Sequence, residues 1–436
     1  MKMQTERTME NSSFHGKARE ALKKHLENIL SSCVIDKGIV NFDRSKDEDL
    51  YKYINEAKKH KKTWMRDIDL YVLLYKQVSD YLTEHNKNRQ ETSEKVKDII
   101  GEKEVASLCD KVISFLESIP RKYLVLFELP AVQGLGLKEI KLTDDISFVE
   151  RVSESDFSDI KIPSKSLYGR DYTLQEGRLN ILISVDGYTD GTLENGAMKK
   201  AYSKFRQVIL LGKLSGVFVE KNRTISAKFL SFGVPHVFVI HELDIKREIY
   251  QVTLSKSVLD YISKIELNEN TLKPTALELL LETFENRETF TSNDKAKILQ
   301  KRFQHPVNLL KIPDNDINAE PLKTAIEWAF DSLTNDNDTV AFIQACIGLE
   351  AILGDNNTME NLTNTLADRC AYLLGDSISA RKRIRKDFKK LYGIRSKVVH
   401  GRKAYLDNDQ RYFLNYAQII LKQVIWKEIS YIKEGG

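Results

Sequence analysis

The spacing of hydrophobic residues divides the chain into regions of different predicted structure. Up to about residue 118, apolar residues recur at helical spacing, as in DIDLYVLLYKQVSDYL and EVASLCDKVISFLESI. From about Lys122 to Leu254 the pattern changes to short β-branched and aromatic runs, such as YLVLFEL and LNILISV, separated by Gly, Asp and Asn. We therefore predict a helical N-terminal region at 1–120 and a β-rich mixed α/β domain at 121–270, in which a helix over Ala197–Leu211 crosses a sheet.

Helical spacing returns in SKSVLDYISKIEL and continues through a predicted helical connector at 271–317. Beyond it, short polar links such as TNDND, GDNNT and GDSIS separate apolar helical segments and carry N-cap residues, which implies antiparallel neighbours. The predicted fold class is multidomain α+β, ending in an all-α helical bundle at 318–436. The helices predicted for this bundle are Glu320–Leu333, Asp338–Leu353, Met359–Leu374, Ser379–His400 and Asn408–Tyr431.

Composition adds the class of protein and excludes several kinds of site. A length of 436 residues with 42% hydrophobic content is enough for two or three domains with real cores. The polar N-terminus lacks the apolar segment of a signal peptide, and the run VILLGKLSGVFV is short and broken by Lys213, so we expect a cytoplasmic protein with no membrane partner. The four cysteines are far apart and form no CxxC or Cys/His cluster. We expect neither a disulfide framework, nor a metal site, nor a cofactor.

Charge is informative locally rather than overall. The net charge of +4 only hints at an anionic partner, but the segment from Arg381 to Lys403 carries many cations opposed only by Asp387. Most charge runs are solvated helix faces. This one is almost single-signed, so its self-repulsion favours contact with phosphates. The residues that we assign to RNA binding are Lys389, Lys390, Lys397, Arg402 and Lys403.

One arginine of this segment stands where a hydrophobic residue is expected. In helical projection Phe388, Leu391, Tyr392 and Val399 form one apolar stripe, and Arg395 falls in its middle. The structural alternative to a functional role is an ordinary buried ion pair. The candidate members of such a network, besides Arg395, are Glu350 in AFIQACIGLEAILG and Arg369 in LTNTLADRCAYLL.

His400 ends the same predicted helix and is followed at once by Gly401, which suits the left-handed position after a helix. The helix dipole there favours the protonated imidazole, so His400 can exchange protons near neutral pH. Cleaving RNA without a metal requires two proton movements and a cation for the phosphorane, whereas one helix supplies one histidine and one arginine. A two-fold homodimer that places two such helices side by side would supply both.

The order LEAILG, LADRCAYLLG, KKLYGIRSKVVHG resembles the Apea-like branch of the HEPN superfamily, whose hallmark is an Arg followed after four to six residues by a His. Here the spacing is four, and the resemblance covers residues 318 to 436. It implies a dimerising helical bundle that cleaves RNA without metal, often as a toxic effector of bacterial antiviral defence or toxin–antitoxin systems. Arg395 would then orient and stabilise the scissile phosphate, and His400 would be the general base or acid. Ser396 matches a polar residue that often follows the Arg, and Glu350 matches the acidic position that holds it.

Two other functions fit the same residues. In the first, the bundle is a non-catalytic module that binds RNA or nucleotide, with a structural Arg395 and His400. In the second, it is a dimerising scaffold that assembles another effector of a defence or toxin–antitoxin complex. Under the nuclease hypothesis we expect accessible loops of a structured RNA, transfer RNA included, as substrate. The first two-thirds of the chain would sense a signal, such as a phage-derived trigger, or bind an inhibitory partner.

Overall fold

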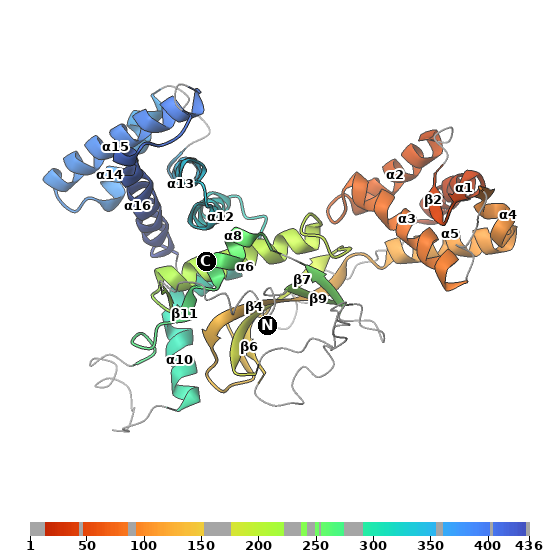
Figure 1. The fold of residues 1–436 in the computed structure, drawn as a ribbon, viewed down its shortest axis with the longest axis horizontal. Helices are drawn as coiled ribbons and strands as arrows, with labels where there is room; N and C mark the ends of the chain where they lie inside the picture. Colours follow the sequence, from red (N-terminus) through yellow and green to blue (C-terminus); the bar gives the residue numbers. More distant parts are fainter. Residues whose placement is uncertain are drawn as a thin grey trace. The chain divides into compact units, whose positions relative to one another are not determined.

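The computed structural model describes residues 14–42, 47–85, 93–151, 176–221, 237–241, 249–252, 254–273, 291–354, 361–401 and 404–432. The chain is mixed α+β, as predicted, and forms two compact units (Figure 1). Unit 1 comprises Met1–Leu124, Val185–Lys200 and Val239–Tyr250, and unit 2 comprises Val125–Ser184, Ala201–Phe238 and Gln251–Gly436.

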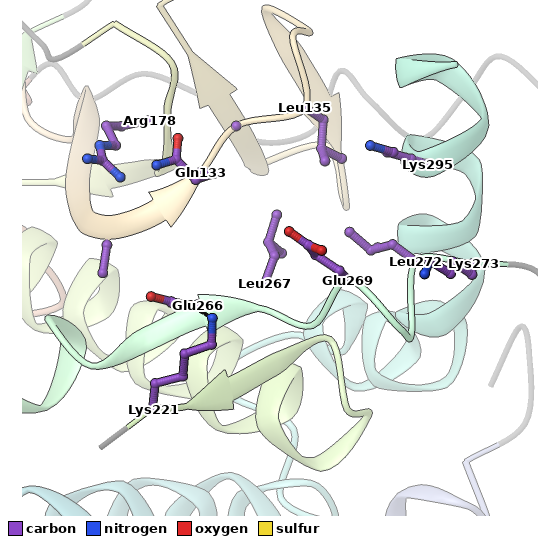
Figure 2. Close-up of a pocket in the computed structure, with 12 residues that line it drawn as sticks. Gln133, Leu135, Arg178, Lys221, Glu266, Leu267, Glu269, Leu272, Lys273 and Lys295 are labelled. Atoms are coloured by element: carbon purple, nitrogen blue, oxygen red, sulfur yellow. Dashed lines mark ion pairs between the residues drawn. The ribbon is translucent and has the colours of Figure 1, made fainter. Parts of the chain in front are cut away.

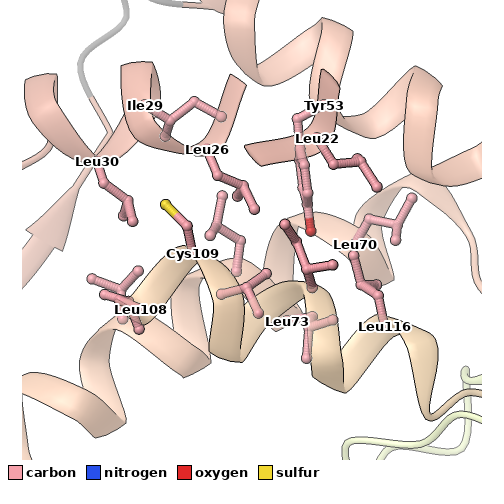
Figure 3. Packing of buried hydrophobic residues seen from close by; sticks show 14 of the residues in the cluster. Leu22, Leu26, Ile29, Leu30, Tyr53, Leu70, Leu73, Leu108, Cys109 and Leu116 are labelled. Carbon is pink, nitrogen blue, oxygen red and sulfur yellow. The ribbon is translucent and has the colours of Figure 1, made fainter. Parts of the chain in front are cut away.

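Unit 1 is mainly helical, with α1 (Gly16–Ser32), α2 (Asp47–Lys61), α3 (Asp67–Glu84), α4 (Val96–Ile100) and α5 (Glu102–Glu117). Two of these, α3 and α5, are the helices predicted from apolar spacing. Their buried faces meet those of α1 and α2 in one leucine-rich core, which Figure 3 shows around Cys109 and Tyr53. Members of this core from the different helices include Leu22, Leu26, Leu70, Leu73 and Leu116.

The sequence pattern did not predict a small antiparallel sheet in unit 1. Strand β1 (Val34–Asp36) pairs with β2 (Ile39–Asn41) on one side and β3 (Glu94–Lys95) on the other. Lys37 and Gly38 make the turn between β1 and β2, and both have positive φ, as a two-residue hairpin requires. Strands of two or three residues are too short to show an alternating pattern.

Unit 2 contains most of a six-stranded sheet in the order β10-β9-β4-β7-β6-β5. Strands β5, β6 and β7 are antiparallel neighbours, with Phe148 of β6 opposite Ile181 of β7. The predicted helix is present as α6 (Gly196–Leu214), and its Phe205 stacks on Phe127 of β4 with ring centroids 4.3 Å apart. The strands are β4 (Arg121–Gln133), β5 (Glu139–Lys141), β6 (Ile146–Glu150), β7 (Arg178–Gly187), β9 (Val237–His241) and β10 (Ile249–Val252).

The segment SKSVLDYISKIEL is helical only in its first part, which corrects the prediction. Helix α8 (Lys256–Ile262) is capped by Ser255, whose hydroxyl accepts a hydrogen bond from the Val258 backbone N–H. After it, β11 (Ile265–Leu267) pairs antiparallel with β8 (Phe218–Glu220) in a separate two-stranded ladder. Ile265 is fully buried in this ladder, so pairing with a distant strand overrides the helical spacing.

The C-terminal helices agree closely with their predicted bounds. They are α12 (Glu320–Thr334), α13 (Asp338–Leu353), α14 (Leu362–Leu374), α15 (Ile378–Val399) and α16 (Arg411–Ile429), and the connector supplies α10 (Ser292–Arg302) and α11 (Gln304–Lys311). The predicted caps are present, because the side chains of Asn337 and Ser377 accept hydrogen bonds from the first turns of α13 and α15. The predicted start of α14 at Met359 lies outside the described residues.

Helix α13 packs closely against α12 and α16 and lies at the centre of the C-terminal helices. A Cβ at Gly348 of α13 would lie 2.7 Å from Leu421 Cδ2 and 3.3 Å from Trp328 Cβ, so any larger residue would force these neighbours to shift. Helix α6 is tied to α12 by Arg206, whose Nη1 lies 3.0 Å from an oxygen of Asp331. Arg206 also pairs with Glu327, and Ser203 donates a hydrogen bond to Glu327, so several polar contacts join α6 to the C-terminal helices.

In the part of the chain that the structure describes, no helix has both the length and the apolar character needed to cross a bilayer. All four cysteines, Cys33, Cys109, Cys346 and Cys370, are buried and free. Burial raises the pKa of Cys33 to about 12, so its thiol remains protonated at neutral pH. The cysteines act as small apolar core residues.

Candidate functional site

The apolar face of α15 places Arg395 against α13. Phe388, Leu391 and Tyr392 are buried, as predicted, and they fix the rotation of the helix. The predicted fourth member of the stripe, Val399, is 47% exposed, which corrects the prediction. The buried part of the face ends one turn earlier, so Arg395 lies at its edge rather than in its middle and reaches both the packed helices and solvent.

Arg395 pairs with Glu350, the acidic residue that the sequence analysis named as its partner. The guanidinium Nη2 lies 2.9 Å from Glu350 Oε1 and donates a hydrogen bond to Oε2 at 3.0 Å. Each of the two side chains is 23% exposed. The contact occupies only one of the three nitrogens, and Arg395 Nε is buried without a hydrogen-bond partner among the described residues. The ion pair thus holds the guanidinium in place through Nη2, while the buried Nε is shielded from solvent.

Tyr392 adds a neutral hydroxyl beside this pair. It donates a hydrogen bond to the carbonyl oxygen of Cys346 at 3.3 Å. Burial, together with the neighbouring Cys346 and Glu350, raises the pKa of Tyr392 well above its ordinary value. Tyr392 therefore remains a phenol at physiological pH.

Arg369, the third candidate for this network, donates a hydrogen bond from Nη1 to the carbonyl oxygen of Leu353 at 2.8 Å. Leu353 is the last residue of α13. A cation at this position satisfies a carbonyl that has no partner within the helix and interacts favourably with the helix dipole. This contact gives Arg369 a role in anchoring α14 to the end of α13.

His400 ends α15 as its C-cap and is exposed. Its backbone N–H donates to the carbonyl of Ser396, and Gly401 follows with φ +67°, the left-handed conformation predicted for it. At helical spacing His400 shares a face with Ser396, Lys389 and Lys386, at i−4, i−11 and i−14. The imidazole thus stands at the end of a solvent-facing row of cations.

Gly393 lies on the same face, one turn before Ser396 and two before His400. It is exposed, and a Cβ built there has no neighbour within 4 Å. A glycine inside a helix costs about 1 kcal/mol relative to alanine. Packing among the described residues does not account for this cost, and the missing side chain leaves the helix backbone open to close approach beside His400.

The basic surface of α15 is less uniform than its sequence suggests. Asp368 of α14 pairs with Arg385 at 2.5 Å, and Asp387 lies 3.7 Å from Lys390, so neither cation is unopposed. This corrects the prediction that Asp387 is the sole counter-charge, because α14 packs alongside α15 and brings a second carboxylate.

The remaining cations of the row are open to an anion. Lys389 is half-buried and Lys397 is exposed, and no ion pair involves either of them within the described ranges. Arg402 and Lys403, also assigned to RNA binding, lie outside the described residues. The observed row therefore comprises unopposed lysines on one face that ends at His400, and we call it the basic face: Lys382, Lys386, Lys389 and Lys397.

Arg395 and His400 do not meet within one chain. They are separated by about 140° around the helix axis, and no hydrogen bond joins them in the region that the structure describes. Arg395 faces α13, whereas His400 belongs to the basic face. A single α15 therefore presents Arg395 and His400 on different sides.

Among the described residues, no group of three or more His, Cys, Asp or Glu side chains is placed to hold a metal ion. No protein-family model, curated protein or solved structure matches this chain. The assignment of the site therefore depends on its own residues. Sequence reasoning missed the Tyr392 hydroxyl and the exposed Gly393. The signal for Gly393 was available, since a glycine inside a long helical pattern is costly.

Proposed function

We propose that the C-terminal helices form a HEPN-like endoribonuclease that cleaves RNA without a metal, acting as a dimer and as a toxic effector of antiphage defence. The observation that carries the proposal is the combination of Arg395, fixed by Glu350 at the partly exposed edge of the packed face, and an exposed His400 at the end of the basic face. The rest of the chain would sense the activating signal. Regulation is expected because an unrestrained ribonuclease harms its host.

The reaction follows from what these groups can do. His400 of one copy removes the proton from a ribose 2′-OH, whose oxygen attacks the adjacent phosphorus. Arg395 donates hydrogen bonds to the phosphorane oxygens as negative charge develops on them. The 5′-oxygen leaves and takes a proton from the His400 of a second copy. The products are a 2′,3′-cyclic phosphate and a 5′-hydroxyl, so atoms and protons balance.

The nature of the RNA ends tests the reaction. Purified protein incubated with total RNA should produce 2′,3′-cyclic phosphate and 5′-hydroxyl ends at the same rate with and without a chelator. Ligation methods specific for each type of end measure this, and sequencing of the ends identifies the RNA that is cut. Cleavage that stops in the chelator, or ends that carry a 5′-phosphate, would contradict the proposed chemistry.

The basic face should bind RNA through unopposed charge. Replacing Lys389 and Lys397 together with glutamine should weaken RNA binding and reduce the slope of log affinity against log salt by about 1 for each phosphate that is no longer neutralised. Arg385→Gln is the matched control, because Asp368 already opposes that charge. Fluorescence anisotropy over a series of salt concentrations measures both slopes. Equal slopes for all variants would exclude the basic face as the RNA surface.

A second function has support from one observation. Because Arg395 and His400 do not contact each other within a chain, the basic face could bind RNA while Arg395 serves only to join α15 to α13. Such a module would bind RNA with the same salt dependence but release no new ends. Binding and cleavage measured on the same RNA therefore separate this alternative from the nuclease.

A further inference from the structure

A second site with distinct chemistry lies in the middle of unit 2. A cavity of about 630 Å³ opens between the end of β4, the β8–β11 ladder and α10 (Figure 2). This volume is within the range of about 300 to 1,000 Å³ that small-molecule sites occupy. The lining residues are Ala131, Gln133, Gly134, Leu135, Arg178, Lys221, Glu266, Leu267, Glu269, Leu272, Lys273 and Lys295.

The charged residues of this lining are mainly cationic. Lys221 forms an ion pair with Glu266. The other charged lining residues are three cations with no ion pair among the described residues, Arg178, Lys273 and Lys295, and one carboxylate, Glu269. The three cations come from β7, from the loop after β11 and from α10, and Figure 2 shows Lys295 extending from α10 toward the cavity. Cations that line one cavity repel each other unless an anion lies between them.

A buried carboxylate shapes the rim of the cavity. Glu150 is 4% exposed, and its Oε2 accepts a hydrogen bond from the Gly136 backbone at 2.9 Å. A Cβ on Gly134 would lie 2.0 Å from the carboxyl carbon of Glu150, so any side chain there would collide with it. The hydrogen bond from Gly136 to Glu150 ties down the loop whose Gly134 and Leu135 line the cavity.

The remaining wall is suited to a flat ring. Ala131 and Leu272 are buried, and Leu135 and Leu267 are half-buried, so they present apolar surface beside the cations. Gln133 and Glu269 add polar groups that can accept hydrogen bonds from hydroxyl or amino groups. We propose that this cavity binds a phosphorylated small molecule with a polar ring, of mononucleotide size, with the phosphate at the end lined by Lys273 and Lys295 and the ring toward Gln133 and Arg178 (Figure 2). The cavity is separate from Arg395 and His400, and the proposal does not depend on the nuclease activity.

Calorimetric titration of the full chain carrying His400→Ala tests the proposal without RNA cleavage. The probes are ATP, AMP, adenosine, pyrophosphate and citrate. ATP and AMP should bind saturably, more tightly than adenosine or pyrophosphate, and citrate should not compete with them. Lys295→Ala should weaken ATP binding by about tenfold or more, because hydrogen bonds to a charged group are lost. Lys297→Ala on the same helix is the matched control, since Lys297 is exposed and does not line the cavity.

Several outcomes would overturn the proposal. Absence of saturable ATP or AMP binding at millimolar concentration excludes the phosphorylated ligand class. Equal losses for Lys295→Ala and Lys297→Ala show that any binding lies elsewhere. Displacement of ATP by citrate at similar concentration shows a general anion surface instead of a site for a phosphorylated ring compound. Because the protein is measured without its proposed catalytic histidine, none of these results bears on the nuclease.

Discussion

Replacing His400 with alanine is expected to lower the rate of RNA cleavage by about 10²- to 10⁴-fold, the usual contribution of a general acid or base. The fold should be unaffected, because His400 is exposed and contributes only its backbone to the end of α15. The free energy of unfolding should therefore change by less than about 0.5 kcal/mol, as for other surface substitutions. Initial rates on a labelled RNA, together with thermal unfolding of the same samples, measure the two effects.

His305→Ala is the matched control for this variant. His305 is also exposed, lies on α11 in the same unit and is absent from the basic face. It should cleave RNA at the rate of the unchanged protein. If His400→Ala and His305→Ala cleave RNA equally well, or if His400→Ala inhibits growth as strongly as the original chain does, His400 is not a catalytic residue. Either result would favour the alternative in which the C-terminal helices bind RNA without cleaving it.

The C-terminal helices were predictable because local signals coincide with their ends. Asn337 and Ser377 each precede an apolar helical pattern and do cap the helices that follow. Gly401 likewise marks the end of α15. In such segments the chain contains its own start and stop signals, so the sequence alone locates each helix to within a residue or two at most ends.

Strand β11 shows where local reasoning fails. Its residues continue the apolar spacing of α8, and the decisive interaction is a ladder with β8, more than forty residues earlier in the chain. The cavity in unit 2 could not be predicted for the same reason. Its cations Arg178, Lys221, Lys273 and Lys295 come from four separate segments, and no pattern in any one of them indicates that they share a site.

The candidate site at α15 was predictable in part. The position of Arg395 on a partly apolar face predicted a buried partner, but spacing alone left Glu350 and Arg369 as possible members of the network. The packing of α15 on α13 pairs Arg395 with Glu350, and Arg369 binds the end of α13. Val399 was assigned to the buried stripe because a projection assumes that neighbouring helices cover the whole length of α15.

Replacing Arg395 with alanine is expected to impair both cleavage and stability, in contrast to His400→Ala. The variant leaves Glu350 partly buried without its cation, which should lower the free energy of unfolding by roughly 1 to 3 kcal/mol. Cleavage should fall by about 10²-fold or more, because donors that stabilise developing charge are lost. Chemical denaturation and initial cleavage rates measure these effects separately, provided that rates are taken where the variant remains folded.

Two further variants separate the structural role of Arg395 from the catalytic one. Arg395→Lys keeps the positive charge but loses the fork of donors, so it should retain much of the stability while cleaving about tenfold or more slowly. In a double-mutant cycle, Arg395→Ala combined with Glu350→Ala should destabilise the protein by about 1 kcal/mol less than the sum of the single changes, because the second change removes the uncompensated carboxylate. Cleavage should stay low in that double variant, since restoring stability does not restore the guanidinium. Recovery of cleavage along with stability would mean that Arg395 acts only as a structural ion pair, and the phosphate-binding role proposed for it would be wrong.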